Sequence, residues 1–210
     1  SLVGLDYFDG RLPETVPSDE RRKINAFDYE HAFAGSAGFD IVIGNPPYVR
    51  QEILGADFKR YAQKTFKTYA GTADLYTYFI EKSLGLLAKD GTYSVIVANK
   101  WLRANYGEPL RQFLRTRRID HIVDFGDLQV FAGATTYPCI LKASNRAPGD
   151  FFVCNVPSPD FDNLAALVAQ KQFKVSLANL AKSGGWSLVN DAEAKLLAKI
   201  KAAGVPLGEY

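Results

Sequence analysis

Phe39-Asp40-Ile41-Val42-Ile43-Gly44 runs directly into Asn45-Pro46-Pro47-Tyr48, and this junction decides the fold. The apolar run predicts a β-strand over residues 39–43. Each of the two prolines fixes its own φ and pushes the preceding residue out of the helical region, so the strand must end in a rigid turn. We call residues 45–48 the Asn-Pro-Pro-Tyr turn.

Strands and helices are expected to alternate along the rest of the chain. Apolar residues at three- and four-residue spacing predict helices over 72–88, ended by Lys89-Asp90-Gly91, and over 109–116, begun by Pro109. The other expected elements are a polar loop at 49–71, strands at 92–98, 119–125 and 137–143, and a last helix from an Asn190 cap to about residue 203. This alternation predicts an α/β fold with ligands at the carboxyl ends of the strands, where the Asn-Pro-Pro-Tyr turn lies.

The turn carries residues suited to the methylation of an exocyclic amine. Such an amine, as in adenine, is a poor nucleophile because its lone pair is delocalised into the ring. The Asn45 side-chain oxygen and the Pro46 carbonyl, held by Pro47, would accept its two N–H bonds and turn the nitrogen toward tetrahedral geometry. Tyr48 offers an aromatic face to a flipped-out base. Because an amide cannot accept a proton, the proton released would pass to water. The alternative is that Asn before Pro merely ends a strand.

Composition sets broad limits on the chain. Its 210 residues, 47% of them hydrophobic, can bury the core of one domain or most of one, and a net charge of +2 neither demands nor excludes a nucleic-acid partner. Cys139 and Cys154 lack zinc-type spacing and His31 and His121 stand far apart, so we expect no metal site and a reducing compartment. Without a membrane-length apolar stretch or a signal peptide, the sequence predicts a soluble, cytoplasmic protein.

Several stretches resemble the amino-methyltransferases that act on adenine N6 in DNA, in particular the type IIG restriction-modification enzymes and the methylases of BREX phage-defence systems. In the order of that family, they are residues 38–50, Gly71-Thr72-Ala73-Asp74-Leu75-Tyr76, Asn99-Lys100-Trp101-Leu102, Asp124-Phe125-Gly126-Asp127, Val130-Phe131 and Thr135-Thr136-Tyr137-Pro138. The segment 186–210 resembles the part that precedes a target-recognition domain. The resemblance implies a Rossmann-like sheet dependent on S-adenosylmethionine, here its C-terminal half, with helices on its faces and double-stranded DNA as partner.

The resemblance also implies roles around the target base. It assigns the Asn45 side chain and the Pro46 carbonyl to the target amine, and Tyr48 to stacking on the flipped adenine. Phe131 matches the aromatic residue that packs on the other side or edge of that base, with an ordinary core phenylalanine as the alternative. Asp74 and Tyr76 are expected to be structural supports.

For the cofactor, Phe79 matches a position that lines the S-adenosylmethionine pocket, although its helical spacing also suits a plain core role. Asp28 is a candidate contact for the adenine of the cofactor. A complete enzyme of this kind has a Gly-rich turn before its Asn-Pro-Pro-Tyr, and no such Gly-x-Gly turn precedes residue 45 here. Ser1-Leu2-Val3-Gly4 resembles the tail of the cofactor-binding element.

We therefore expect a fragment: an irregular lead-in at 1–37, the catalytic half of a methyltransferase domain at 38–144, and a connector toward a target-recognition domain at 145–210. Alone it should be inactive, since little would hold the sulfonium methyl about 3 Å from the amine. Its sheet should expose apolar edges or faces. The sequence does not indicate an oligomeric state.

Two basic segments are candidates for DNA contact. The segment 57–69 has the composition of a phosphate-gripping flap, with a solvated loop as the alternative. Its cations are Lys59, Arg60, Lys64 and Lys67, interleaved with Phe58, Tyr61, Phe66 and Tyr69. Phosphate contacts of this kind position a duplex without reading its sequence. The second cluster is Arg111, Arg115, Arg117 and Arg118, which also suits the wet face of a helix.

Two other functions stay open. Enzymes with a similar tetrapeptide methylate the side-chain amide of glutamine in release factors, or an amine in ribosomal RNA; the stretches at 71–76 and 124–131 favour the DNA enzymes. The other alternative is a DNA-recognition or assembly module without turnover, against which an intact Asn45 and Tyr48 argue.

Overall fold

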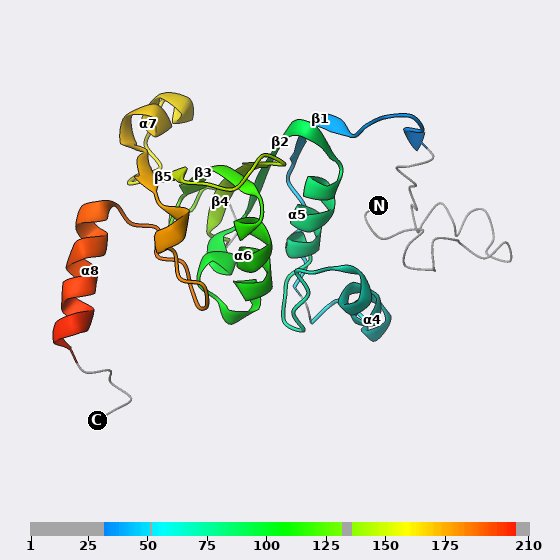
Figure 1. The fold of residues 1–210 in the computed structure, drawn as a ribbon, viewed down its shortest axis with the longest axis horizontal. Helices are drawn as coiled ribbons and strands as arrows, with labels where there is room; N and C mark the ends of the chain where they lie inside the picture. Colours follow the sequence, from blue (N-terminus) through cyan, green and yellow to red (C-terminus); the bar gives the residue numbers. More distant parts are fainter. Residues whose placement is uncertain (1–31, 51, 132–135, 205–210) are drawn as a thin grey trace, which may run out of the picture.

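The computed structural model describes residues 32–50, 52–131 and 136–204. These residues form a six-stranded sheet with the strand order β1-β2-β4-β3-β5-β6 (Figure 1). The strands are β1 (Phe39–Gly44), β2 (Leu87–Ala98), β3 (Arg118–Asp124), β4 (Pro138–Ser144), β5 (Phe151–Asn155) and β6 (Phe173–Val175). The predicted α/β class is confirmed.

The sheet is mixed. β1 runs parallel to β2 and β3 runs parallel to β5, while β4 lies antiparallel between β2 and β3. Consequently β1, β2, β3 and β5 all point the same way, and the segments that follow them emerge at one edge of the sheet, which we call the carboxyl edge. The Asn-Pro-Pro-Tyr turn, residues 99–104 and residues 125–131 meet at this edge.

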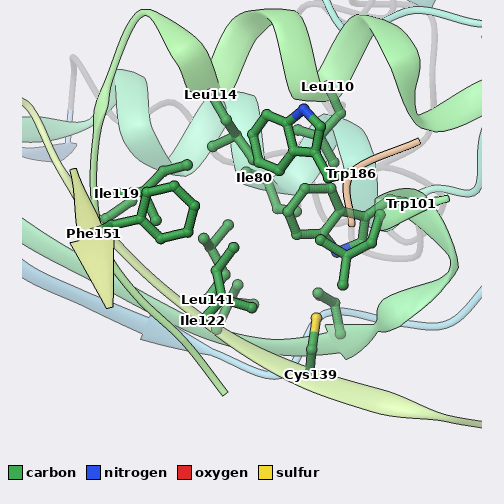
Figure 2. Packing of buried hydrophobic residues seen from close by; sticks show 14 of the residues in the cluster. Ile80, Trp101, Leu110, Leu114, Ile119, Ile122, Cys139, Leu141, Phe151 and Trp186 are labelled. Atoms are coloured by element: carbon green, nitrogen blue, oxygen red, sulfur yellow. The ribbon is translucent and has the colours of Figure 1, made fainter. Parts of the chain in front are cut away.

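One face of the sheet carries the main core. α5 (Tyr76–Gly85) and α6 (Glu108–Arg115) cover this face, and their side chains meet alternate residues of the strands (Figure 2). Trp101 and Trp186 pack edge to face inside it, with ring centroids 5.9 Å apart. Burial of a large apolar side chain stabilises the fold by about 1.5–3 kcal/mol. This core therefore fixes the strands whose ends form the carboxyl edge.

The opposite face carries a smaller core that does not reach β1. Val123, Phe125, Cys154 and Val156 form its buried part, and α7 (Leu164–Lys171) packs on it. On β1, by contrast, Ile41 and Ile43 are 73% and 79% exposed. The apolar exposure expected of the sheet is thus found at β1.

The predicted polar loop over 49–71 is wrong, because α4 (Ala56–Thr65) occupies its middle. Phe58 and Ala62 recur at helical spacing and pack in a separate small core with Phe66 and Tyr78. The rings of Phe66 and Tyr78 lie 5.1 Å apart, and those of Phe58 and Tyr78 lie 5.7 Å apart. The mixture of cations and aromatic residues in this segment is therefore the pattern of an amphipathic helix.

The predicted helix over 72–88 is present but shorter, and β2 begins earlier than expected. Lys89-Asp90-Gly91 lies inside β2, where the pairing with β1 slips between Phe39 and Ile41. Gly91 is required there because a Cβ at this position would lie 2.5 Å from the Phe39 carbonyl. The other predicted strands and the helix at 109–116 are confirmed with small shifts in their bounds.

The sheet also continues past the expected boundary at residue 144. β5 pairs with β3, and β6 pairs with β5, so residues 151–175 belong to the sheet and are not a connector. The expected Asn190 cap is confirmed at the start of α8 (Asp191–Ala203), where the Asn190 side chain accepts from the Glu193 N–H at 3.0 Å. That the segment precedes a target-recognition domain remains a prediction. None of the described helices is long and apolar enough to cross a membrane.

Candidate functional site

The Asn-Pro-Pro-Tyr turn is fastened to a strand and to a helix. The Tyr48 hydroxyl donates a hydrogen bond to the Ile96 carbonyl of β2 at 3.2 Å. On the other side, the Leu75 N–H at the start of α5 donates to the Val49 carbonyl at 3.0 Å. These two contacts fix the C-terminal end of the turn, and its N-terminal end continues from β1, which pairs with β2.

Two acceptors of the turn remain available to a ligand. The Asn45 side chain is exposed, whereas Pro46 is buried. Within the described residues, no hydrogen bond occupies the Asn45 side chain or the Pro46 carbonyl. The proline rings restrict the backbone on which both acceptors stand. The turn can thus offer two oriented oxygens to the N–H groups of one amine.

Tyr48 is held by its hydroxyl while part of its ring stays accessible. The side chain is 36% exposed. Burial raises the pKa of the Tyr48 hydroxyl, and the nearby Cys139 raises it further. The phenol therefore stays protonated at neutral pH and keeps donating to Ile96, which fixes the orientation of the ring.

A second polar network lies farther along the carboxyl edge and joins β2 to β3. Asn99 Nδ2 donates to the Asp124 carboxylate at 2.8 Å and to the Gly126 carbonyl at 2.9 Å. The Gly126 N–H donates to the same Asp124 oxygen at 3.0 Å, and Gly126 has a φ of +59°, a left-handed conformation that glycine adopts readily. This network fixes the start of the loop that leads to Phe131.

Phe131 lies at the end of that loop and is half-buried. Leu128 and Val130 anchor the loop on the smaller core, whereas none of the hydrophobic clusters of the described residues includes Phe131. The alternative of an ordinary core phenylalanine stays open. Stacking of Phe131 on a base stays a prediction.

Of the two candidate cofactor contacts, Phe79 lies on α5 and Asp28 lies outside the described residues. Phe79 is half-buried, and its N–H donates to the Leu75 carbonyl at 3.4 Å. Because the Leu75 N–H holds Val49, Phe79 stands one helical turn, about 5.4 Å, from the anchor of the Asn-Pro-Pro-Tyr turn. The described structure thus places one of the two near the site.

Asp74 and Tyr76, expected as structural supports, take part in one hydrogen-bonded chain. The hydroxyls of Tyr76 and Tyr106 are 3.0 Å apart, and the Tyr106 hydroxyl donates to the Asp74 carboxylate at 3.4 Å. Tyr76 is almost wholly buried in the main core. Burial raises the pKa of Tyr106 to about 12, so its hydroxyl remains a donor at neutral pH. This chain braces the start of α5, to which the Asn-Pro-Pro-Tyr turn is bound.

The four cations predicted to contact the DNA backbone lie on or just after α4. They are Lys59, Arg60, Lys64 and Lys67. Arg60 forms an exposed ion pair with Asp57. The Glu81 carboxylate accepts the Lys67 N–H at 3.1 Å and the Thr68 N–H at 2.8 Å, which ties the end of this segment to α5. Contacts of these side chains with phosphates remain a prediction.

The second basic cluster makes internal contacts, and for Arg111 the predicted DNA contact is wrong because the residue is buried. Arg111 is 1% exposed, and its Nη1 donates to the carbonyls of Trp101 and Ala104, the latter at 2.9 Å. The other three guanidiniums bind the Leu180 carbonyl (Arg115), the Asn145 side chain (Arg117) and Asp120 (Arg118). Helical spacing alone did not reveal that α6 turns Arg111 inward.

A pocket of about 260 Å³ opens at the carboxyl edge, lined by Asn99, Lys100, Leu102, Arg103, Ala104 and Asp124. A larger, open hollow of about 920 Å³ lies along residues 159–170 beside α7 and contains no residue of the candidate site. The sequence analysis assigned no role to Lys100 or Arg103. The feature of the sequence that could have pointed to them is their position directly after a strand. In the described ranges, no three His, Cys, Asp or Glu side chains gather as metal ligands would.

Comparisons with known proteins agree on one family. The family described as Eco57I restriction-modification methylase matches residues 4–131. The chain is 41% identical over 112 residues to the Type II methyltransferase M.XhoI of Xanthomonas vasicola, covering 52% of this chain and 20% of that protein. It is 35% identical over 131 residues to the Type II methyltransferase M.PaeR7I of Pseudomonas aeruginosa, covering 61% of this chain and 23% of that protein. The chain thus spans about a fifth of the length of these curated relatives.

Among solved structures, the type IIG restriction endonuclease BpuSI matches with a TM-score of 0.54 and 18% identity, over 78% of this chain and 22% of that one. At this identity the likeness concerns the fold alone. It agrees with the predicted α/β class.

Proposed function

The chain belongs to the Eco57I restriction-modification methylase family, and from this we propose that it takes part in methyl transfer from S-adenosylmethionine to the N6 amine of an adenine flipped out of duplex DNA. M.XhoI and M.PaeR7I are type II methyltransferases, which supports DNA methylation within a restriction-modification or phage-defence system. Such a protein would act on DNA in the cytoplasm.

One observation carries the proposal. The Asn45 side chain and the Pro46 carbonyl are two acceptors that no other group of the described structure occupies, on a backbone held by two prolines. An adenine N6 amine has two N–H bonds to donate. Binding both would turn the nitrogen toward tetrahedral geometry. The two hydrogen bonds would strengthen as the transition state forms. A turn that only ended a strand would not require these acceptors to be open.

The other residues of the site would orient the base and exclude water from it. Tyr48 would stack on one face of the flipped adenine, and Phe131 would close the other side or the edge. Bound S-adenosylmethionine would supply the methyl group as an electrophilic sulfonium. The amide of Asn45 accepts hydrogen bonds but no proton, so the proton of the methylated amine would leave to water.

The residues present fit the cofactor in part. Phe79 is aromatic, half-buried and one helical turn from the contact that anchors the Asn-Pro-Pro-Tyr turn, which suits a residue lining the cofactor pocket. The exposed cations Lys64 and Lys67, with Lys59 and Arg60, would hold DNA phosphates beside the site.

Transfer of a tritiated methyl group tests the proposal. The full-length protein would be incubated with labelled S-adenosylmethionine and mixed-sequence duplex DNA, beside its Asn45→Ala variant. Loss of one oriented acceptor should lower kcat about 10²–10³-fold. Asn179→Ala, an exposed asparagine after β6, is the matched control and should keep wild-type activity.

Identification of the labelled product separates the remaining alternatives. Label in N6-methyladenine that depends on Asn45 supports the proposal. Label in protein glutamine or in RNA would favour the other amino-methyltransferases. No transfer by the wild-type protein, or equal transfer by Asn45→Ala, would leave a DNA-binding module without turnover.

A further inference from the structure

Residues 99–104, which we call the basic turn, follow β2 at the carboxyl edge beside the Asn-Pro-Pro-Tyr turn. Its first part is a short 3-10 helix, η1 (Asn99–Leu102). The Tyr48 hydroxyl is hydrogen-bonded to the Ile96 carbonyl. From Ile96 the chain continues through the last two residues of β2 and the first two residues of η1 to Lys100. Extended and 3-10 rises place Lys100 roughly 10 Å along the chain from that contact.

The backbone of the basic turn is locked from below. The buried Arg111 donates to two of its carbonyls, and the Trp186 N–H donates to the Leu102 carbonyl at 2.7 Å. Gly107 and Gly185 allow two further segments to lie against it, since a Cβ on Gly185 would be 3.1 Å from the Arg103 Cα. The turn is a rigid platform at the edge of the sheet.

The outward side chains of this platform are cationic and unpaired. Lys100 and Arg103 are both exposed, and neither forms an ion pair or a side-chain hydrogen bond within the described residues. This separates them from Arg60, which forms an exposed ion pair with Asp57, and from the four arginines of residues 111–118, which serve internal contacts. Two unpaired cations on a fixed backbone are available to bind an anion.

A pocket large enough for an anion lies between them. It measures about 260 Å³, and its polar lining includes Asn99 and Asp124. Asp124 is the acidic group among the lining residues, but it is 8% exposed and accepts from Asn99 and from the Gly126 N–H. The carboxylate is therefore turned inward, whereas the two cations are exposed, so the accessible rim of the pocket is positive.

We propose that Lys100 and Arg103 form a phosphate-binding site that holds the DNA strand beside the base bound by the Asn-Pro-Pro-Tyr turn. The inference rests on the proposed function and adds to it a contact that no sequence pattern assigned. Extrusion of a base costs a few kcal/mol and swings its sugar-phosphate backbone, so a fixed cationic site next to the base pocket would stabilise the flipped state. The site carries no sequence information.

Salt dependence of DNA binding gives a direct test. We would measure the Kd of the full-length protein for a duplex that contains its methylation site, between 50 and 200 mM salt, with wild type, Lys100→Ala, Arg103→Ala and the double variant. Each phosphate contact contributes about 0.9 to the slope of log K against log salt. Because the site holds one phosphate, the wild-type protein should lose about 3.5-fold more affinity than the double variant over this fourfold range.

Matched controls are Lys89→Ala and Arg146→Ala. Both are exposed cations at the opposite edge of the sheet, and they should leave the slope unchanged. The exchange variants Lys100→Arg and Arg103→Lys keep the charge and should keep the wild-type slope.

Removing the charge of a single DNA phosphate locates the phosphate that the site contacts. A duplex with a single methylphosphonate next to the target adenine should bind the wild-type protein more weakly, and the double variant should show no further loss, as expected of two changes that remove one interaction. The phosphate site would be overturned if the affinity losses from the methylphosphonate and from the double substitution were additive, or if the double variant kept the wild-type salt slope. Methyl transfer by the wild-type protein would in that case still uphold the proposed function. A wild-type protein that neither binds nor methylates DNA would overturn both.

Discussion

The Tyr48 hydroxyl and the Ile96 carbonyl, 48 residues apart in the sequence, are joined by a hydrogen bond of 3.2 Å. This bond makes the position of an aromatic ring in the candidate site depend on β2, a strand at the centre of the main core. The ring therefore inherits the rigidity of the sheet, although it belongs to a turn.

The variants Tyr48→Phe and Tyr48→Ala separate the contribution of the Tyr48 hydrogen bond from that of its aromatic ring. The phenylalanine keeps a stacking surface and loses a hydrogen bond worth about 1 kcal/mol, so we expect methyl transfer to fall about fivefold. The alanine also loses base stacking, worth about 1–3 kcal/mol, and should be at least about fivefold worse than the phenylalanine. Steady-state methyl transfer to DNA measures both. Equal activity of the two variants would remove the ring from the mechanism.

Asn99→Ala should destabilise the fold by about 1–3 kcal/mol, because it takes a donor from the nearly buried Asp124 carboxylate and from the Gly126 carbonyl. Urea unfolding measures the change. Asn105→Ala, an exposed neighbour, is the control and should stay within about 0.5 kcal/mol of wild type. A similar loss in both variants would show that the Asn99 network adds nothing of its own.

Arg111→Met should loosen the basic turn while leaving the sheet intact. The substitution keeps apolar bulk but removes the Arg111 donor from the Trp101 carbonyl and leaves the Ala104 carbonyl with the Gly107 N–H. We expect the amides of Arg103 and Ala104 to exchange hydrogen at least about tenfold faster, which corresponds to about 1.4 kcal/mol of local stability. Exchange at Leu141 in β4 is the internal reference. Uniform acceleration at all three amides would indicate global destabilisation.

Alkaline pH should destabilise the protein through Tyr78. Burial, with a smaller contribution from the nearby Tyr69, raises the pKa of Tyr78 from 10.0 to about 12 in the folded state. The unfolded chain therefore releases this proton first, and its contribution to stability, complete below pH 10, is lost as pH rises toward 12, by roughly 2 kcal/mol. Tyr78→Phe should flatten the fall of unfolding free energy over this interval. An unchanged pH profile would contradict the prediction.

The sequence predicted those elements whose patterns are local. The apolar run at 39–43, the Pro109 start of α6 and the Asn190 cap of α8 each have a cause within a few residues, and the structure bears them out. The sequence does not predict α4, because the aromatic residues of this segment are interleaved with cations, a composition that suggests a binding surface. In the structure, the apolar side of α4 packs on α5.

Other features depend on tertiary contacts that no local pattern encodes. The inward turn of Arg111 is decided by two carbonyls of the basic turn, and the membership of β5 in the sheet is decided by its pairing with β3. In the candidate site, Asn45 and Tyr48 were predicted from the sequence alone. The Asn99 network was not, since its partners lie about 25 residues away.

The parallel pairing of β1 with β2 also determines when this site can exist during synthesis. Asn45 and Tyr48 leave the ribosome well before Leu75 and Ile96, the residues that anchor their turn. Closure of such a long loop is entropically costly, and contacts distant in sequence form late in folding. A nascent chain therefore lacks both anchors of the Asn-Pro-Pro-Tyr turn until β2 has been translated and paired, so translation itself delays the moment at which the turn is held in place.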